Sequence, residues 1–226
     1  MYNKFYYLHI PKTGGRYIKS KILPQLLNHI EVVSMVDHSG WINEIDDNTY
    51  IMTIIRDPIK TICSLYTHMV ISRIGILNND EDLKKGINSY KKIKNLYLDK
   101  TFFINWLTEN NAYHNLQSKH FLPIFPSISD NAAPVEKNIN LILKRLDRIN
   151  LKFDHDSVIG EGIYKIANKI YEDLNIYIDI KSDSSYKYYN VGSSLLYNSL
   201  TDEEKKYISK YFDIDYIIYN KILGRE

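Results

Sequence analysis

Residues 4–17 read KFYYLHIPKTGGRY, a short apolar run that meets a proline and passes through a Lys-Thr-Gly-Gly tract. The pattern predicts a strand over residues 4–10, followed by a helix over residues 15–28 that Pro24 kinks or shortens. A strand, a glycine-containing turn and a helix in this order bring free backbone N–H groups and the positive end of a helix dipole to one point. The stretch therefore predicts an anion-binding turn.

A second strand-to-helix junction lies at residues 49–58, TYIMTIIRDP. The segment before the Asp-Pro pair is apolar almost throughout, which is typical of a strand covered on both faces. Asp57 is a good helix N-cap and Pro58 suits the first helical position, so we expect a helix from there to about residue 72. Strands and helices that alternate in this way predict an α/β fold of three layers, with helices flanking a mostly parallel central sheet.

The rest of the chain extends this alternation. Further strands are expected at residues 31–36 and 151–160. Further helices are expected at residues 80–98 (broken by Gly86), 101–110, 134–149, 161–174 and 201–212. The last begins with TDEE, a capping box from Thr201 to Glu204, and follows a polar loop at residues 183–194. No Pro/Gly/Ser-rich linker divides the chain, so residues 1–226 are expected to form a single domain.

The composition is that of an ordinary soluble protein, because 44% hydrophobic and 25% charged residues do not suit a disordered or fibrous chain. A net charge of +2 provides no overall basic field for nucleic acid. The lone Cys63 excludes an internal disulfide and a cysteine-rich zinc site, and no other metal-ligand spacing is convincing. We see no membrane span of roughly 18 apolar residues and no signal peptide, so a cytoplasmic protein is expected.

The glycine turn after the first strand carries residues suited to an anion. Gly14 and Gly15 let the backbone approach it closely, Thr13 adds a hydroxyl, and Lys12 and Arg16 add positive charge. The tract is not a Walker A motif, because that motif needs its lysine after the second glycine and Lys12 precedes both. An ordinary ATP- or GTP-binding loop is therefore the weaker interpretation.

The second junction adds Arg56 at its strand end and Ser64 eight residues later, about two turns into the expected helix. These two side chains can converge on a second phosphate. An arginine at a strand end is by itself often a surface ion pair. Two anion-binding junctions in one small domain predict a ligand with two separated anionic groups.

At these residues the chain resembles the sulfotransferase family that uses 3′-phosphoadenosine 5′-phosphosulfate (PAPS), especially its carbohydrate (heparan- and chondroitin-type) branch. HIPKTGGRY at residues 9–17 resembles the family's HIPKTGGTS, and RDPIKTICSLY at residues 56–66 resembles its RDPxxRxxSxY. Weaker similarity includes an Asn-x-Gln segment at Asn115 and Gln117. Where the family usually keeps a threonine, this chain has Gly15 and Arg16.

The resemblance implies a P-loop-like sulfotransferase fold and transfer of a sulfuryl group from PAPS to a hydroxyl or amine of an acceptor, with a carbohydrate as the expected acceptor. It implies that Lys12 stabilises the leaving group. The residues that it assigns to the nucleotide are Lys12, Thr13, Gly14, Gly15, Arg16, Tyr17, Arg56, Ser64 and Asn190. A non-catalytic module that binds adenosine bisphosphate, and less strongly a P-loop-type kinase, stay open as alternatives.

The general base expected of such an enzyme is His38, because it follows the second predicted strand and strand ends on one side of a parallel sheet converge. Asp37 and Glu44 are its substitutes, whereas His68 and His120 are interpreted as surface or packing residues. The lysines of residues 84–94 suit a solvated helix face better than an acidic acceptor. Trp106 is interpreted as a core residue before a sugar-stacking one.

Overall fold

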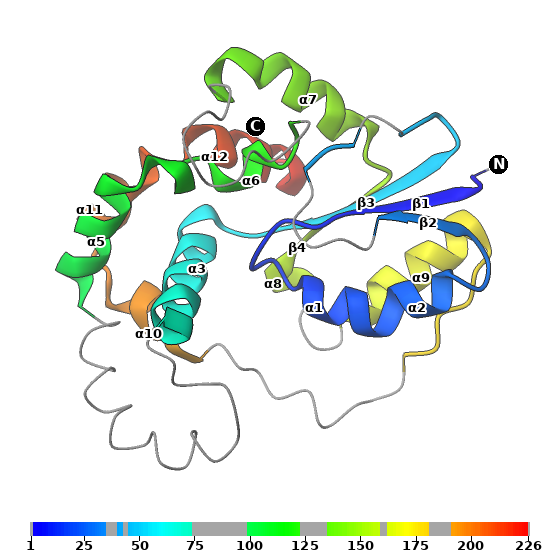
Figure 1. The fold of residues 1–226 in the computed structure, drawn as a ribbon, viewed down its shortest axis with the longest axis horizontal. Helices are drawn as coiled ribbons and strands as arrows, with labels where there is room; N and C mark the ends of the chain where they lie inside the picture. Colours follow the sequence, from blue (N-terminus) through cyan, green and yellow to red (C-terminus); the bar gives the residue numbers. More distant parts are fainter. Residues whose placement is uncertain are drawn as a thin grey trace, which may run out of the picture.

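The computed structural model describes residues 2–34, 40–42, 45–73, 99–122, 135–158, 162–180 and 191–225. Within these ranges four parallel strands form one sheet in the order β2-β1-β3-β4. The strands are β1 Lys4–Leu8, β2 Glu31–Ser34, β3 Thr49–Ile55 and β4 Leu151–Asp154. Helices flank both faces of the sheet (Figure 1), so the predicted three-layer α/β fold is confirmed.

The helical segments follow the predicted order along most of the chain. They are α1 Gly15–Tyr17, the π-helix η1 Ile18–Ile22, α2 Leu23–Leu26, α3 Pro58–Arg73, α5 Lys100–Glu109, the 3₁₀-helix η2 Asn111–Tyr113, α6 Leu116–Lys119, the 3₁₀-helix η3 Val135–Asn138, α7 Ile139–Arg148, α8 His155–Val158, α9 Ile163–Leu174, α10 Val191–Ser199, α11 Asp202–Ser209 and α12 Asp213–Leu223. No helix in the described ranges is both long enough and apolar enough to cross a membrane.

Alternation along the strands builds two cores, one on each face of the sheet. Phe5 and Tyr7 of β1 pack with η1, α2 and α9 on one face. Tyr6 and Leu8 pack with α7 and α12 on the other. A third apolar cluster joins α3, α5, α10 and α11 at one end of the molecule, where the helices stand beside the sheet rather than over it (Figure 1).

Local capping signals in the sequence are confirmed. The Asp57 carboxylate accepts a hydrogen bond from the Lys60 backbone N–H at 2.9 Å at the start of α3. Thr201 and Glu204 form both bonds of the capping box at the start of α11. Each bond satisfies a backbone donor that the first turn of a helix leaves free, so neighbouring residues are enough to decide where these helices begin.

Two sequence predictions are corrected. The strand expected over residues 151–160 ends at Asp154, because the chain turns into α8 at His155 and the Ser157 hydroxyl donates to the Asp154 carbonyl at 2.7 Å. The loop expected over residues 183–194 has become helix by Val191, and Leu196 of that helix is buried against α3 and α5. The expected helix at residues 80–98 lies outside the described residues.

The strand order reverses direction between β1 and β3. In the order β2-β1-β3-β4, the chain moves outward in one direction from β1 to β2 and in the other from β3 to β4. Open α/β sheets commonly bind ligands at the carboxyl ends of the strands beside such a reversal. Lys12 follows β1 and Arg56 follows β3, so both predicted anion-binding junctions lie at this point of the sheet.

Candidate functional site

The loop between β1 and α1 has a backbone that few sequences adopt. Lys12 has φ 64° and Gly14 has φ 94°, both in the left-handed region. A lysine in this region is uncommon and is held there by its surroundings. The buried Thr13 hydroxyl donates to the Ile10 carbonyl at 2.8 Å, which closes the turn from inside. Its proton therefore serves the loop and not a ligand.

Gly15 has to be a glycine because the ring of His9 lies against it. A Cβ at position 15 would lie 1.8 Å from His9 Nε2, far inside contact distance. The His9 ring is buried and stacks on Tyr7 with ring centroids 5.4 Å apart, so it has little room to withdraw. This contact gives a physical reason for the glycine at position 15.

We therefore expect Gly15→Ala to lower the free energy of unfolding by about 1–3 kcal/mol, the usual cost of an overpacked buried position. Urea unfolding of four chains checks this: the wild type, the single variants Gly15→Ala and His9→Ala, and the double variant. In the His9→Ala background, Gly15→Ala should leave the free energy of unfolding nearly unchanged. A methyl that costs the same with and without His9 would show that the ring is not the obstacle.

The junction between β3 and α3 is held by a side chain from a distant part of the chain. The Gln117 amide accepts from the Arg56 backbone N–H at 3.0 Å and donates to the Arg56 carbonyl at 2.7 Å. Gln117 is fixed in turn, because its own N–H donates to the buried Asp215 carboxylate at 3.0 Å. Asn115 caps α12 through the N–H groups of Ile214 and Asp215. The Asn-x-Gln segment thus positions the Arg56 backbone.

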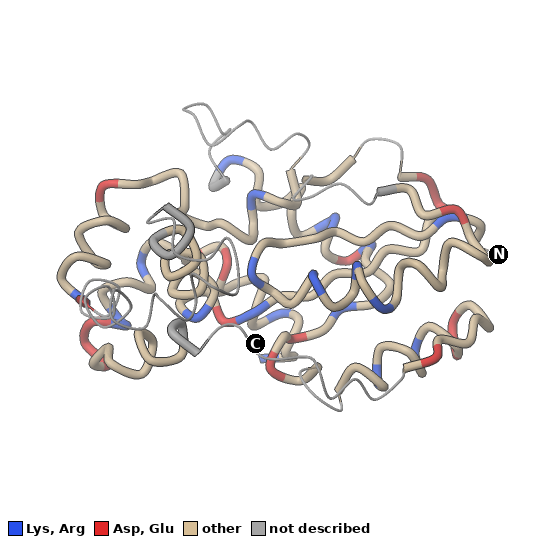
Figure 2. Tube along the Cα trace, turned by 60° about the horizontal axis from the view of Figure 1, so that its bottom comes forward, with Lys and Arg blue, Asp and Glu red and all other residues tan. Residues whose placement is uncertain are grey.

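Three cations gather where the two junctions meet. Arg56 Nη1 donates to the Lys12 carbonyl at 3.4 Å, which ties the two loops together. Burial, followed by the charges of Arg16 and Arg56, lowers the pKa of Lys12 to about 8. Basic and acidic residues both occur along the described trace (Figure 2), and the charges of Asp156, Asp57 and Asp154 also act on Arg56. A site in which cations repel one another favours an anionic ligand.

Two polar atoms of the second junction, at the end of β3 and within α3, are buried and have no hydrogen-bond partner among the described residues. They are Nε of Arg56 and Oγ of Ser64, in side chains of which 9% and 1% of the residue surface is exposed. Leaving a buried donor unpaired costs about 1–3 kcal/mol, so such atoms need a reason. Oxygens of an anionic ligand would satisfy donors of this kind. The structure thus leaves the two residues predicted for a second phosphate free to bind one.

His155 and Asp156 belong to the same region and were missed from the sequence. The His155 ring lies beside Gly14, since a Cβ there would be 3.3 Å from its Cδ2, and its Nδ1 lies 3.0 Å from an Asp156 carboxylate oxygen. The signal was available, because a His-Asp pair directly follows a short strand at its carboxyl end. The pair was missed because the predicted strand extended to residue 160, which placed His155 and Asp156 inside the strand and not at its end.

Other predicted residues lie elsewhere or outside the described chain. Tyr17 is partly buried against the core under the sheet, and Arg16 is exposed. His68 is exposed on α3, and the buried His120 has its Nδ1 2.9 Å from the Leu116 carbonyl, in agreement with surface and packing roles. The residues outside the described ranges are Asp37, His38, Glu44, the lysines of residues 84–94 and Asn190.

Trp106 is confirmed as a packing residue. Its ring stacks on Tyr113 with centroids 4.9 Å apart and packs into the cluster that joins α3 and α5. Within the described ranges, no group of three or more His, Cys, Asp or Glu side chains is placed to hold a metal ion.

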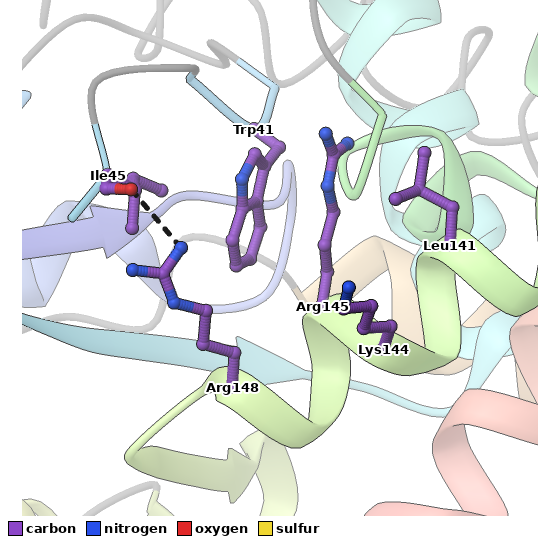
Figure 3. A pocket seen from close by; sticks show the side chains of 6 residues that line it. All are labelled: Trp41, Ile45, Leu141, Lys144, Arg145 and Arg148. Carbon is purple, nitrogen blue, oxygen red and sulfur yellow. Dashed lines mark hydrogen bonds between the residues drawn. The ribbon is translucent and has the colours of Figure 1, made fainter. Parts of the chain in front are cut away.

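A pocket of about 240 Å³ lies beside α7 (Figure 3). Its residues differ in their chemistry from those of the site at Lys12, Arg56 and Ser64. Its arginines are engaged: Arg148 donates to the Ile45 carbonyl at 3.2 Å, and Arg145 donates to the Phe121 carbonyl and stacks over Trp41. These contacts fasten α7 to its neighbours. The pocket offers no buried atom without a partner, so we place the candidate site at Lys12, Arg56 and Ser64.

Comparisons of the chain with protein-family models, with curated proteins and with solved structures found no match. A function therefore has to follow from the residues and the geometry of the site.

Proposed function

We propose that this chain is a sulfotransferase that transfers the sulfuryl group of PAPS to a hydroxyl or amine of an acceptor, with a carbohydrate as the acceptor class. The observation that carries the proposal is the pair of buried, unpartnered atoms of the second junction, Arg56 Nε and Ser64 Oγ, together with the contact of Arg56 with the loop of Lys12. The two junctions suit two anionic groups on one ligand. PAPS has such groups, a 3′-phosphate and a 5′-phosphosulfate, and the resemblance of both sequence motifs supports the same ligand.

The proposed reaction requires these residues to position the donor and to stabilise developing charge. Transfer breaks the bond between sulfur and the bridging oxygen of the donor, and forms a bond from sulfur to the acceptor oxygen or nitrogen. Negative charge grows on the bridging oxygen, where the Lys12 ammonium donates a hydrogen bond, and adenosine 3′,5′-bisphosphate leaves. Arg56 and Ser64 hold the 3′-phosphate. The acceptor proton passes to a general base, for which we keep His38, with Asp37 and Glu44 as substitutes.

The lowered pKa of Lys12 gives a pH-dependent prediction. In the free protein Lys12 loses its proton near pH 8, and a bound anion raises that pKa because it offsets the repulsion from Arg16 and Arg56. The Lys12 contribution to ligand affinity should therefore be constant below about pH 7, and the affinity should fall by up to about tenfold per pH unit above pH 8. Calorimetric titration with adenosine 3′,5′-bisphosphate checks this. Lys12→Arg, which stays charged, should flatten the profile, and an unchanged profile would remove Lys12 from the site.

The test of the proposed function compares adenosine 3′,5′-bisphosphate with AMP and with ATP, by calorimetry, with and without Mg²⁺. A sulfotransferase site should prefer the bisphosphate to AMP by at least about tenfold, because a charge-assisted contact contributes about 1.5–3 kcal/mol. Equal affinity for the bisphosphate and AMP would contradict the proposal. Magnesium-dependent turnover of ATP would favour the kinase alternative.

Radiolabelled PAPS, incubated with hydroxyl- and amine-bearing glycans, separates the enzyme from the non-catalytic module. The enzyme should transfer label to an acceptor. Tight binding of the bisphosphate with no transfer to any acceptor would favour the module.

A further inference from the structure

The His155 ring lies against the loop after β1 and within electrostatic reach of Arg56 at the end of β3. It follows β4 directly, 13% of its side chain is exposed, and it lies against Gly14 of the loop after β1. Its Nδ1 lies 3.0 Å from Asp156 Oδ1, and a Cβ at Gly14 would lie 3.8 Å from its Nε2. Because Nδ1 faces a carboxylate, the neutral ring carries its proton there, and Nε2 is left on the side of the loop.

Charged groups act on this ring from α8, from α3 and from the end of β3. Asp156 of α8 lies beside it and also forms an ion pair with Lys60 of α3. Arg56, at the end of β3, acts on it with a positive charge. The loop after β1 contributes the uncharged Gly14 at the contact, with Lys12 and Arg16 as its charged residues.

The balance of these effects keeps the ring neutral in the free protein. Burial first, and then the charges of Arg56 and Lys60, lower the pKa of His155 to about 4, although Asp156 acts in the opposite direction. An anion bound at Arg56 cancels the repulsion that opposes a proton on the ring. It also offers an acceptor to an N–H at Nε2, since Nε2 lies beside the same loop.

We propose that His155 is a proton-linked anion-binding residue: when an anionic ligand binds beside Arg56 and the loop of Lys12, His155 takes up one proton from solvent at Nε2. The identity of the ligand as adenosine 3′,5′-bisphosphate rests on the proposed function, whereas the proton uptake does not. The consequence is a site that binds its anion more tightly as the pH falls through the pKa of His155 in the complex. Release of the bisphosphate is correspondingly favoured as the pH rises.

The test follows the histidine ring resonances of the full chain by NMR between about pH 4 and pH 8, free and saturated with ligand. One probe is inorganic sulfate, whose charge is constant over this range, and the other is the bisphosphate. We expect bound ligand to raise the pKa of His155 by at least about one unit, which corresponds to a tenfold change in affinity. His29, exposed between α2 and β2, is the matched control and should not move.

The titration is done on the wild-type chain, so it does not depend on a variant that folds, and His155→Gln serves to assign the resonance. A His155 whose pKa is the same with and without bound sulfate or bisphosphate overturns the inference and leaves the proposed function standing. Sulfate that raises this pKa while the bisphosphate fails to bind supports the inference and removes the proposed function. Failure of both probes to bind overturns both.

Discussion

Replacing Lys12 by alanine is expected to lower the rate of sulfuryl transfer by about 10²- to 10³-fold, the effect of removing a donor aimed at developing charge. Affinity for adenosine 3′,5′-bisphosphate should fall much less, because the contact strengthens as the bridging oxygen gains charge. Alanine keeps the Cβ of lysine, so the cost of the left-handed backbone at φ 64° is unchanged. The loss can then be assigned to the ammonium group.

For Lys12→Ala, the rate of sulfuryl transfer is measured under single-turnover conditions. The affinity for the product, adenosine 3′,5′-bisphosphate, is measured by calorimetry. Lys169→Ala is the control, since Lys169 is exposed on α9 and pairs with Glu172 and Asp173, away from the junctions. Equal losses in rate and in product affinity would make Lys12 a binding residue only. A normal rate would remove it from the mechanism.

Replacing Arg56 by alanine is expected to weaken binding of adenosine 3′,5′-bisphosphate by at least about tenfold and to leave AMP nearly unchanged. The guanidinium is buried with Nε free, and a charge-assisted hydrogen bond contributes about 1.5–3 kcal/mol. Gln117 holds the backbone of residue 56, so the junction between β3 and α3 should survive the truncation, although the 3.4 Å hydrogen bond from Arg56 Nη1 to the Lys12 carbonyl is lost. Calorimetry with the two nucleotides decides: equal losses for both would mean that Arg56 does not bind the 3′-phosphate.

Ser64→Ala serves as a companion that separates binding from folding. The Ser64 hydroxyl is buried without a partner among the described residues, so its removal should leave the free energy of unfolding unchanged or slightly higher. Affinity for the bisphosphate should nevertheless fall. A variant with lower stability and normal affinity would indicate that this hydroxyl has a structural partner instead of a ligand.

Much of the fold could be predicted because it depends on interactions within a few residues. The buried run of β3, the Asp57 cap and the capping box at Thr201 each involve neighbours in the chain. The alternation of strands and helices then restricts the arrangement, since parallel strands need helical crossovers that cover the sheet. The end of β4 and the start of α10 were misjudged, because short segments are decided by what packs against them.

The candidate site likewise has residues that could be predicted from the sequence and residues that could not. Lys12, Arg56 and Ser64 could be identified because each belongs to a motif that is continuous in sequence. His155 and the Gln117 clamp could not, because their partners lie far along the chain: Gln117 is 61 residues from Arg56, and His155 meets Gly14 only after β4 has joined the sheet beside β3. Contacts of this kind have no local pattern.

The sequence by itself determined the α/β class, the two strand-to-helix junctions predicted to bind anions and the residues that carry their charge, because these follow from backbone geometry and side-chain chemistry over short spans. Only the tertiary structure decided that the two junctions meet, that Arg56 Nε and Ser64 Oγ are buried without partners among the described residues, and that His155 joins them. The reason is physical. Burial and electrostatic coupling depend on distances in space, which the strand order sets between residues that the sequence keeps apart.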